Sequence, residues 1–307
     1  MRIALHDADA QHLSSKSKFP NYALMKISAY HKSIGDTVEW FMPLYRDLYD
    51  KIYSSKVFDF TPEDPFLPEN AIKGGTGYGF FEELPSEIDR MFPDYSIYPD
   101  CDYAIGFLTR GCPNKCANCY VPQKEGDIRP YNRWQDIVRN DTKKLVLMDN
   151  NITAHPLGIQ QLKELAGTEY EIDINQATSA FTITEEVAEI FSHLKWIKFI
   201  RLACDRKSQI NAVLNAAHIL KDKGIPNSKL FIYVLITKDL QDNLERIYAM
   251  RNLRSATIYG MPYKDMRIGE MPEHWQMVMA QKYIYSGQWR KIDWMQWEKE
   301  HKFYFAR

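Results

Sequence analysis

Three cysteines stand close together in the middle of the chain, at Cys112, Cys116 and Cys119. Their C-x3-C-x2-C spacing offers three thiolates to one metal centre. Random placement of five cysteines in 307 residues would give such a triple in about one chain in a thousand. A 4Fe-4S cluster held by three thiolates keeps one iron open to a small molecule that can then be reduced. The spacing therefore indicates chemistry rather than electron transfer alone.

Two other uses of these thiols are compatible with the residue types. Structural zinc usually takes four protein ligands, so a zinc site would need one more. That ligand would come from one of three distant residues: Cys101, Cys204 or His155. A redox couple between Cys116 and Cys119 would leave Cys112 without a role. The spacing favours the cluster over both alternatives.

The segment from Cys112 to Tyr120 resembles the cluster-binding loop of the radical S-adenosylmethionine (SAM) superfamily. The resemblance implies that the three cysteines hold a 4Fe-4S cluster and that SAM chelates the open iron. One electron then cleaves SAM to methionine and a 5′-deoxyadenosyl radical, which abstracts hydrogen from a substrate. Tyr120 occupies the aromatic position whose backbone meets adenine in that family. The implied electron donor is a reduced flavodoxin or a ferredoxin-type protein.

Apolar runs alternate with helical patterns from the cysteine loop onward, which predicts an α/β fold with parallel strands. The expected strands span 103–108, 144–148, 171–175, 197–203, 230–236 and 257–259. A capped helix start is expected at Thr182, and a helix over 208–223 is expected to end at Gly224. Six such units over 101–265 form an incomplete (β/α)6 TIM-like barrel, which is the architecture that the resemblance implies.

Polar side chains follow several of these strands, and active sites of parallel barrels form at the carboxyl ends of strands. Asp149, Asn150 and Asn151 stand where the family often has a Gly-Gly-Glu segment that receives the amino group of SAM. Asn175 and Arg201 are the candidates for contacts to the ribose and the methionyl carboxylate. Asp and Asn also favour turns and helix caps, so a structural role is the alternative for each.

Residues 1–100 predict a small Rossmann-like α/β lobe. Strands are expected at 2–5, 37–41, 57–58 and 71–73, with a helix over 22–33. The lobe resembles the cobalamin-binding domain found in one radical SAM branch, but the Asp-x-His-x-x-Gly phrase is absent around His6, His12 and His31. Cobalamin held by a histidine is therefore not expected, and binding without a histidine ligand stays open. The glycine-rich run 74–79 predicts a turn.

Residues 266–307 are rich in aromatic side chains and predict helices that close the open side of the barrel. The tryptophans are Trp275, Trp289, Trp294 and Trp297. Core packing is favoured over a wall that stacks substrate.

Composition limits the partners. The chain has 39 basic and 40 acidic residues, so its net charge of −1 gives no global attraction to nucleic acid and leaves only a local basic patch open. No apolar run approaches the roughly 18 to 20 residues of a membrane span, and the start has no signal-like apolar segment. We expect a cytoplasmic protein, where thiols stay reduced.

The remaining thiols, Cys101 and Cys204, are too few for a second full cluster. Hydrogen abstraction from a small-molecule or peptide substrate is therefore the main expectation, with no catalytic side chain identified. Two alternatives remain. One is cobalamin-dependent methyl transfer. The other is a regulatory protein that binds a cluster without turnover, which the missing Gly-Gly-Glu segment keeps open.

Overall fold

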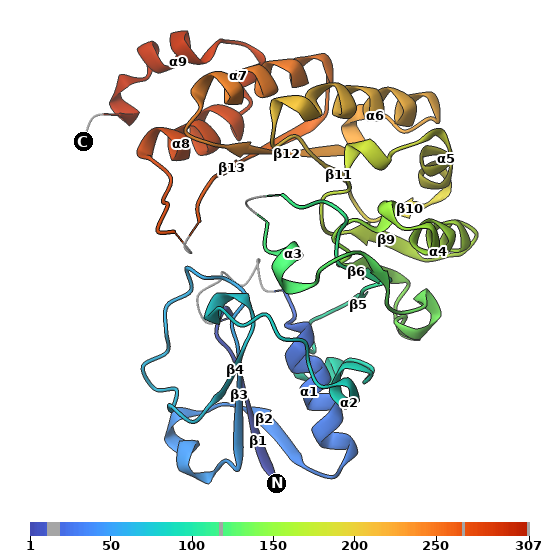
Figure 1. Cartoon of the computed structure of the whole chain (residues 1–307), viewed down its shortest axis with the longest axis vertical. Coiled ribbons are helices and arrows are strands. Elements are labelled where there is room, and N and C mark those ends of the chain that lie inside the picture. Colours follow the sequence, from blue (N-terminus) through green and yellow to red (C-terminus); the bar gives the residue numbers. More distant parts are fainter. Residues whose placement is uncertain (11–18, 117–118, 266–267, 306–307) are drawn as a thin grey trace. The chain divides into compact units, whose positions relative to one another are not determined.

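The chain divides into two compact units in a computed structural model that describes residues 1–10, 19–116, 119–265 and 268–305 (Figure 1). The first unit holds residues 1–104 and 123–125, and the second holds 105–122 and 126–307. The first boundary therefore follows Ala104 rather than residue 100. The aromatic-rich segment expected as a separate part at 266–307 belongs to the second unit.

The first unit is built on a parallel sheet with strand order β2-β1-β3-β4. Its elements are β1 (Arg2–Asp7), α1 (Tyr22–Ser33), β2 (Thr37–Trp40), η2 (Pro43–Leu48), β3 (Lys51–Ser55), β4 (Ile72–Gly74), η3 (Thr76–Tyr78), α2 (Ser86–Asp89) and η4 (Tyr95–Ile97). The central strand β1 explains the layering, because its alternate side chains point to opposite faces. Ile3 and Leu5 pack with Leu24 of α1, whereas Ala4 packs with Ile52 on the other face.

One expected strand of this unit is wrong. Residues 57–58 are not a strand, and the strand lies instead at β3, which pairs with β1 and β4. Ser54 and Ser55 at the end of β3 are buried and hydrogen-bonded to His6 and Asn21. Because these buried positions are polar, the hydrophobic pattern of the strand is hidden in the sequence.

The second unit contains a sheet of order β10-β9-β8-β5 and a sheet of order β11-β12-β13. The strands are β5 (Ala104–Gly106), β8 (Lys144–Leu147), β9 (Glu171–Ile174), β10 (Lys195–Trp196), β11 (Ile200–Ala203), β12 (Leu230–Ile236) and β13 (Thr257–Pro262), with a small antiparallel pair of β6 (Thr109–Arg110) and β7 (Arg129–Pro130). The helices that connect them are α4 (Pro156–Ala166), α5 (Glu185–His193), α6 (Ile210–Asp222) and α7 (Leu240–Ala249). The short helix α3 (Val121–Lys124) lies between β6 and β7, and only its first two residues belong to this unit.

The expected α/β arrangement with parallel strands is confirmed. The pairs β8–β9, β9–β10, β11–β12 and β12–β13 are all parallel. The expected strand 197–203 is shorter than predicted, because β11 begins at Ile200 and pairs with β12, whereas the separate short strand β10 precedes this range and pairs with β9. A parallel bridge between Thr178, which follows β9, and Leu202 of β11 connects the two sheets.

The helix ends follow from local chemistry. Thr184, not Thr182, is the N-cap of α5, and its hydroxyl accepts a hydrogen bond from the backbone N–H of Val187. Residues 180–182 form a short 3-10 turn instead. Helix α6 ends at Asp222, and Gly224 follows with φ of +83°, a conformation that favours glycine.

The C-terminal segment packs as core. It contains α8 (His274–Val278), the π-helical turn η11 (Met279–Ile284), η12 (Gln288–Arg290) and α9 (Trp294–Glu300). Trp289, Trp294 and Trp297 are buried. A Cβ added at Gly260 of β13 would lie 2.8 Å from the side chain of Ile284, so η11 packs tightly on that strand. Among the described residues, no helix combines the length and apolarity that a membrane span requires.

Candidate cluster-binding site

The cysteine loop begins where β6 ends, and the turn before Cys112 requires a glycine. Gly111 has φ of +82°, and a Cβ there would lie 2.3 Å from the carbonyl oxygen of Asp127. The backbone N–H of Cys112 donates to the carbonyl of Gly126 at 3.1 Å, which closes the base of the loop. Cys112, Cys116 and Cys119 are free thiols and half-buried, so they are accessible from solvent without lying on an open surface.

Asp149 fixes the strand that leads into this loop. Its carboxylate accepts hydrogen bonds from the backbone N–H of Leu108 at 3.1 Å, and from the backbone N–H and hydroxyl of Thr109 at 2.5 and 2.7 Å. The side chain is 1% exposed. Burial raises the pKa of Asp149 to about 6, although the hydrogen bonds from Thr109 and Leu108 oppose the rise. Asp149 therefore holds the loop through β6.

Asn151 lies beside the first cysteine. Its side-chain Nδ2 is 3.8 Å from the sulfur of Cys112, and its Oδ1 accepts a hydrogen bond from the backbone N–H of Ser179 at 3.3 Å. The side chain is 3% exposed. The amide thus points its donor end at the thiol, while the segment after β9 fixes its orientation.

Arg206 lies beside the second cysteine. Its Nη2 is 3.9 Å from the sulfur of Cys116. The sequence pattern pointed to Arg201 of β11 and did not single out Arg206. The signal was available, because Arg206 is the next polar residue after Asp205, just beyond the carboxyl end of the same strand. A guanidinium at this place favours a negatively charged sulfur.

The buried Arg246 and the half-buried Asp205 hold the carboxyl ends of β11 and β12 together next to Arg206. The guanidinium of Arg246 is fully buried and donates to the carbonyls of Cys204 at 3.1 Å and Leu235 at 2.7 Å. The carboxylate of Asp205 accepts from the backbone N–H of Leu235 at 3.2 Å, and burial raises the pKa of Asp205. The strand end that presents Arg206 is therefore rigidly braced.

The other expected SAM contacts fall in different places. Asn175 follows β9 and is half-buried; within the part of the chain that the structure describes, its side-chain amide has no hydrogen-bond partner. Arg201 is the second residue of β11 rather than its end, and its guanidinium pairs with Asp173 and donates to the carbonyl of Ile174 at 3.0 Å. Asn175 thus remains available to a ligand, whereas Arg201 already has a protein partner.

Tyr120 is half-buried directly before α3, and Asn150 is half-buried between Asp149 and Asn151. His155 acts as the N-cap of α4, because its Nδ1 accepts from the backbone N–H of Leu157 at 3.1 Å. His155, one of the residues considered as a fourth zinc ligand, therefore has a capping role.

The three sulfurs do not form a finished ligand set. In the described residues there is no group of three or more His, Cys, Asp or Glu side chains placed to hold a metal ion, and residues 117–118 of the loop lie outside them. The chemistry of the donors nevertheless fits an iron-sulfur cluster. Three reduced thiols share one loop, with an amide donor beside Cys112 and a cation beside Cys116, and such groups stabilise metal-bound sulfur.

The remaining two thiols are poor ligands. Cys101 and Cys204 are both buried, and burial raises the pKa of Cys204 to about 12.

The histidines of the first unit that the structure describes are engaged by protein groups. Both ring nitrogens of His6 are within hydrogen-bond distance of side chains, at 2.8 Å from Ser54 and 3.1 Å from Asp64. His31 likewise contacts Asp36 and Tyr53, and His12 lies outside the described residues.

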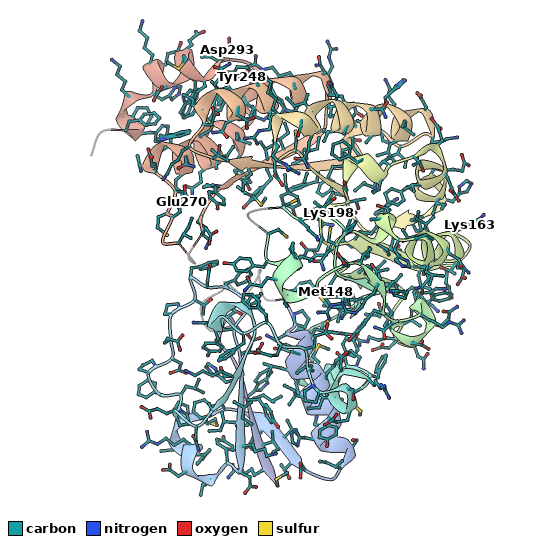
Figure 2. All side chains as sticks on the ribbon, viewed as in Figure 1. Met148, Lys163, Lys198, Tyr248, Glu270 and Asp293 are labelled. Atoms are coloured by element: carbon teal, nitrogen blue, oxygen red, sulfur yellow. The ribbon has the colours of Figure 1, made fainter. Side chains whose placement is uncertain are left out.

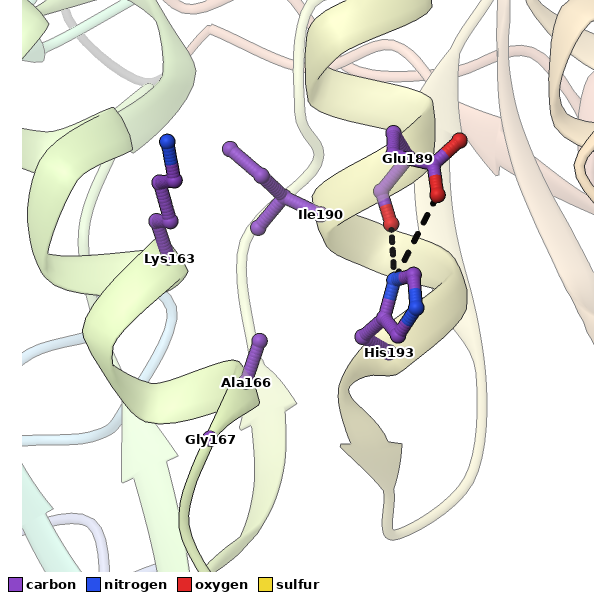
Figure 3. Close-up of a pocket in the computed structure, with 6 residues that line it drawn as sticks. All are labelled: Lys163, Ala166, Gly167, Glu189, Ile190 and His193. Atoms are coloured by element: carbon purple, nitrogen blue, oxygen red, sulfur yellow. Dashed lines mark hydrogen bonds and ion pairs between the residues drawn. The ribbon is translucent and has the colours of Figure 1, made fainter.

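A pocket of about 340 Å³ lies elsewhere in the second unit, between the ends of α4 and α5 (Figure 3). Lys163, Ala166, Gly167, Glu189, Ile190 and His193 line it. Glu189 faces His193 and also pairs with Lys223 at 3.0 Å. None of these residues follows the carboxyl end of a strand, so the pocket does not belong to the cysteine site.

Comparison with protein-family models gives no match to this chain, and comparison with curated proteins gives none either.

Proposed function

We propose that this chain is a radical SAM enzyme in which Cys112, Cys116 and Cys119 hold a 4Fe-4S cluster. The observation that carries the proposal is the placement of the C-x3-C-x2-C loop. It follows the first strand of the second unit, and Cys112 and Cys116 meet residues that lie just past the ends of two other strands, Asn151 after β8 and Arg206 after β11. Such strand ends are where parallel α/β folds assemble active sites.

The order of the strands supports the finer architecture that we propose, an incomplete (β/α)6 barrel. The six expected strands correspond to β5, β8, β9, β11, β12 and β13, and these lie in two sheets together with the additional short strand β10. Two contacts connect β11 to β9 and the segment after it. Arg201 of β11 pairs with Asp173 of β9, and Leu202 of β11 forms a bridge to Thr178. The two sheets are then the consecutive parts of one curved sheet that stays open at its ends.

When bound, the cluster would supply the single electron that breaks the carbon–sulfur bond of SAM, giving methionine and a 5′-deoxyadenosyl radical that takes a hydrogen atom from substrate. The protein side chains have separate tasks. Asn151 and Arg206 stabilise thiolate charge, and Asp149 fixes the loop from behind. Asn175, with its free amide among the described residues, is the best placed of the expected residues to bind SAM.

Asp149 bears on the choice between turnover and binding alone. In the family the position after the second strand offers polar groups to SAM, but here the carboxylate of Asp149 is turned toward Thr109. The amino group of SAM would therefore need Asn150 or backbone carbonyls of this segment. A protein that binds cluster and SAM without cleaving SAM is the second candidate, and this geometry is the observation that favours it.

The test is reconstitution without oxygen. The purified chain is given iron and sulfide, and iron content and the electron paramagnetic resonance signal of the reduced cluster are measured. Dithionite and SAM are then added, and 5′-deoxyadenosine is measured. The variant is Cys116→Ala, and the matched control is Cys101→Ala, which removes a buried thiol of the first unit that is not part of the C-x3-C-x2-C loop.

We expect the intact chain and Cys101→Ala to bind close to four irons and form 5′-deoxyadenosine, and Cys116→Ala to lose both. A cluster and SAM binding with no product would support the binding protein. Equal iron content in both variants would overturn the assignment of the three cysteines. With activity in hand, reduced flavodoxin and ferredoxin replace dithionite to test the proposed donors.

A further inference from the structure

A second region of the second unit gathers positive charge around a cavity of about 450 Å³. Its lining comes from Arg251, Arg254, Ser255 and Arg290. The first three lie on the segment between α7 and β13, and Arg290 ends η12. Because Ser255 lies two residues before β13, the cavity lies at the amino end of that strand. The cysteine loop instead meets Arg206, beyond the carboxyl end of β11 in the same sheet.

Arg251 is fixed in place by several neighbours. Its guanidinium donates to the carbonyl of Trp289 at 2.7 Å, to the carbonyl of Ile292 at 3.0 Å and to the carboxylate of Asp293 at 2.8 Å. It also stands 4.1 Å from the centre of the Tyr248 ring. Figure 2 labels Tyr248 and Asp293, which lie close together at the same end of the second unit. Arg251 thus forms a rigid wall of the cavity.

Arg290 forms a second fixed wall. Its Nη2 donates to the carbonyl of Ala256, and its guanidinium lies 4.3 Å from the centre of the Trp289 ring. Partial desolvation lowers the pKa of Arg290, although the group stays charged near neutrality because an arginine pKa starts so high. The residue is exposed, so an anion can reach its guanidinium from solvent.

Arg254 and Ser255 supply donors that have no protein partner in the described part of the chain. They are the central residues of a turn closed by the backbone N–H of Ala256 and the carbonyl of Leu253 at 3.1 Å. Ser255 has φ of +75°, the one positive φ of a non-glycine residue in the described ranges. Neither backbone N–H of the pair, nor the guanidinium of Arg254, has a hydrogen-bond or ion-pair partner within those ranges. A strained backbone and unused donors at one place are typical of ligand sites.

We propose that this cavity binds a phosphate group, either as free orthophosphate or as the phosphomonoester of a small molecule. Of the three guanidinium groups that line the cavity, only that of Arg251 pairs with a carboxylate among the described residues, that of Asp293, which leaves an excess of two positive charges to match a dianion. Forked guanidinium donors fit phosphate oxygens, and backbone N–H groups add further donors. A volume of about 450 Å³ falls in the range of small-molecule sites and exceeds what a lone carboxylate would need.

The experiment measures binding of orthophosphate and of phenyl phosphate to the full-length chain by isothermal titration calorimetry at 0.15 M and at lower salt. Benzoate serves as the singly charged comparison. The variants are Arg254→Ala and Arg254→Lys, which change an exposed side chain that has no hydrogen-bond or ion-pair partner among the described residues. Arg46→Ala is the matched control, because Arg46 is an exposed arginine of η2 in the first unit.

We expect saturable binding of at least one phosphate probe, weakened roughly tenfold or more by Arg254→Ala and less by Arg254→Lys, which keeps the charge but not the fork. Arg46→Ala should bind as the intact chain does. Binding of orthophosphate alone would identify a free-phosphate site, whereas a preference for phenyl phosphate would identify a phosphorylated small molecule. The proposal is overturned by no saturable binding of either probe, by equal binding of benzoate, or by unchanged affinity in Arg254→Ala.

Discussion

The carboxylate of Asp149 accepts both the backbone N–H and the hydroxyl of Thr109, three positions before the first cysteine of the loop. These contacts join the end of β8 to β6 inside the protein, because both residues are buried. The position of the cysteine loop therefore depends on a side chain that the sequence alone suggested as a ligand for SAM. A buried carboxylate that accepts hydrogen bonds from three donors stabilises the folded chain, so its main role is structural.

Replacing Asp149 should separate the loss of hydrogen bonds from the loss of charge. Asp149→Ala leaves the donors of Leu108 and Thr109 without an acceptor, and we expect a loss of roughly 3 kcal/mol or more in the free energy of unfolding. Asp149→Asn keeps one acceptor oxygen and should lose clearly less. Urea denaturation of the metal-free chain measures both. Equal stability of Asp149→Ala and the intact chain would contradict the assigned role.

The free energy of unfolding should change with pH because the pKa of Asp149 is raised in the folded chain. Its pKa in the folded chain, about 6, lies above the ordinary 3.8, so the ionised form is costly above pH 6 and the cost disappears below about pH 4. The intact chain should therefore gain stability relative to Asp149→Asn as the pH falls through this window, by at most roughly 3 kcal/mol.

The measurement is urea denaturation of the metal-free intact chain and of Asp149→Asn at several pH values from 4 to 7.5. Asp141→Asn is the control. The exposed carboxyl of Asp141 has a pKa held below its usual value by the hydrogen bond from Arg139, so its contribution should change in the opposite direction and be much smaller. A stability difference between the intact chain and Asp149→Asn that does not vary with pH would contradict the prediction.

Much of this organisation could be predicted from sequence, because hydrophobic periodicity carries it. Strand β12 alternates buried and half-buried residues over its whole length, and α1 was expected with its observed bounds. Strand β3 could not be found in this way, since buried serines at its end are satisfied by His6 and Asn21 from elsewhere in the chain. Local patterns do not report such long-range partners.

The same limit applies to the candidate site: its local spacing could be predicted from sequence, whereas its long-range contacts could not. The cysteines were evident from spacing, but the contacts of Arg206 to Cys116 and of Asp149 to Thr109 join residues 90 and 40 positions apart. The packing of several strands decides which polar residue turns toward the cysteine loop. It also decides which polar residue turns toward neighbouring strands instead. Arg201 illustrates the second case, because Asp173 on the neighbouring strand engages its guanidinium.

Two glycines near the loop allow a matched test of its backbone. Gly111 and Gly126 both have positive φ, of +82° and +70°. A Cβ at Gly111 would collide with the carbonyl of Asp127, whereas a Cβ at Gly126 meets nothing within 4 Å. We expect Gly126→Ala to cost roughly 1 to 2 kcal/mol from backbone strain alone. Gly111→Ala should cost clearly more and lower the iron bound on reconstitution. Thermal unfolding and iron analysis measure the difference, and equal effects of the two changes would show that the close approach to Asp127 has no role.

Arg206 should tune the proposed cluster through charge. Reduction adds an electron near Cys116, and a guanidinium 3.9 Å from that sulfur favours the more negative state. We expect Arg206→Ala to lower the reduction potential of the reconstituted cluster, by an amount on the order of tens of millivolts because the arginine is exposed and solvent screens its charge. Arg206→Lys should keep part of the effect.

Redox titration followed by electron paramagnetic resonance measures the reduction potential of each variant. Lys207→Ala is the control, because that neighbouring cation pairs with Glu245 instead of a cysteine. Equal reduction potentials in Arg206→Ala and Lys207→Ala would rule out a specific influence of Arg206 on the cluster. The iron content of Arg206→Ala should equal that of the intact chain, which would show that a shifted potential does not come from loss of the cluster.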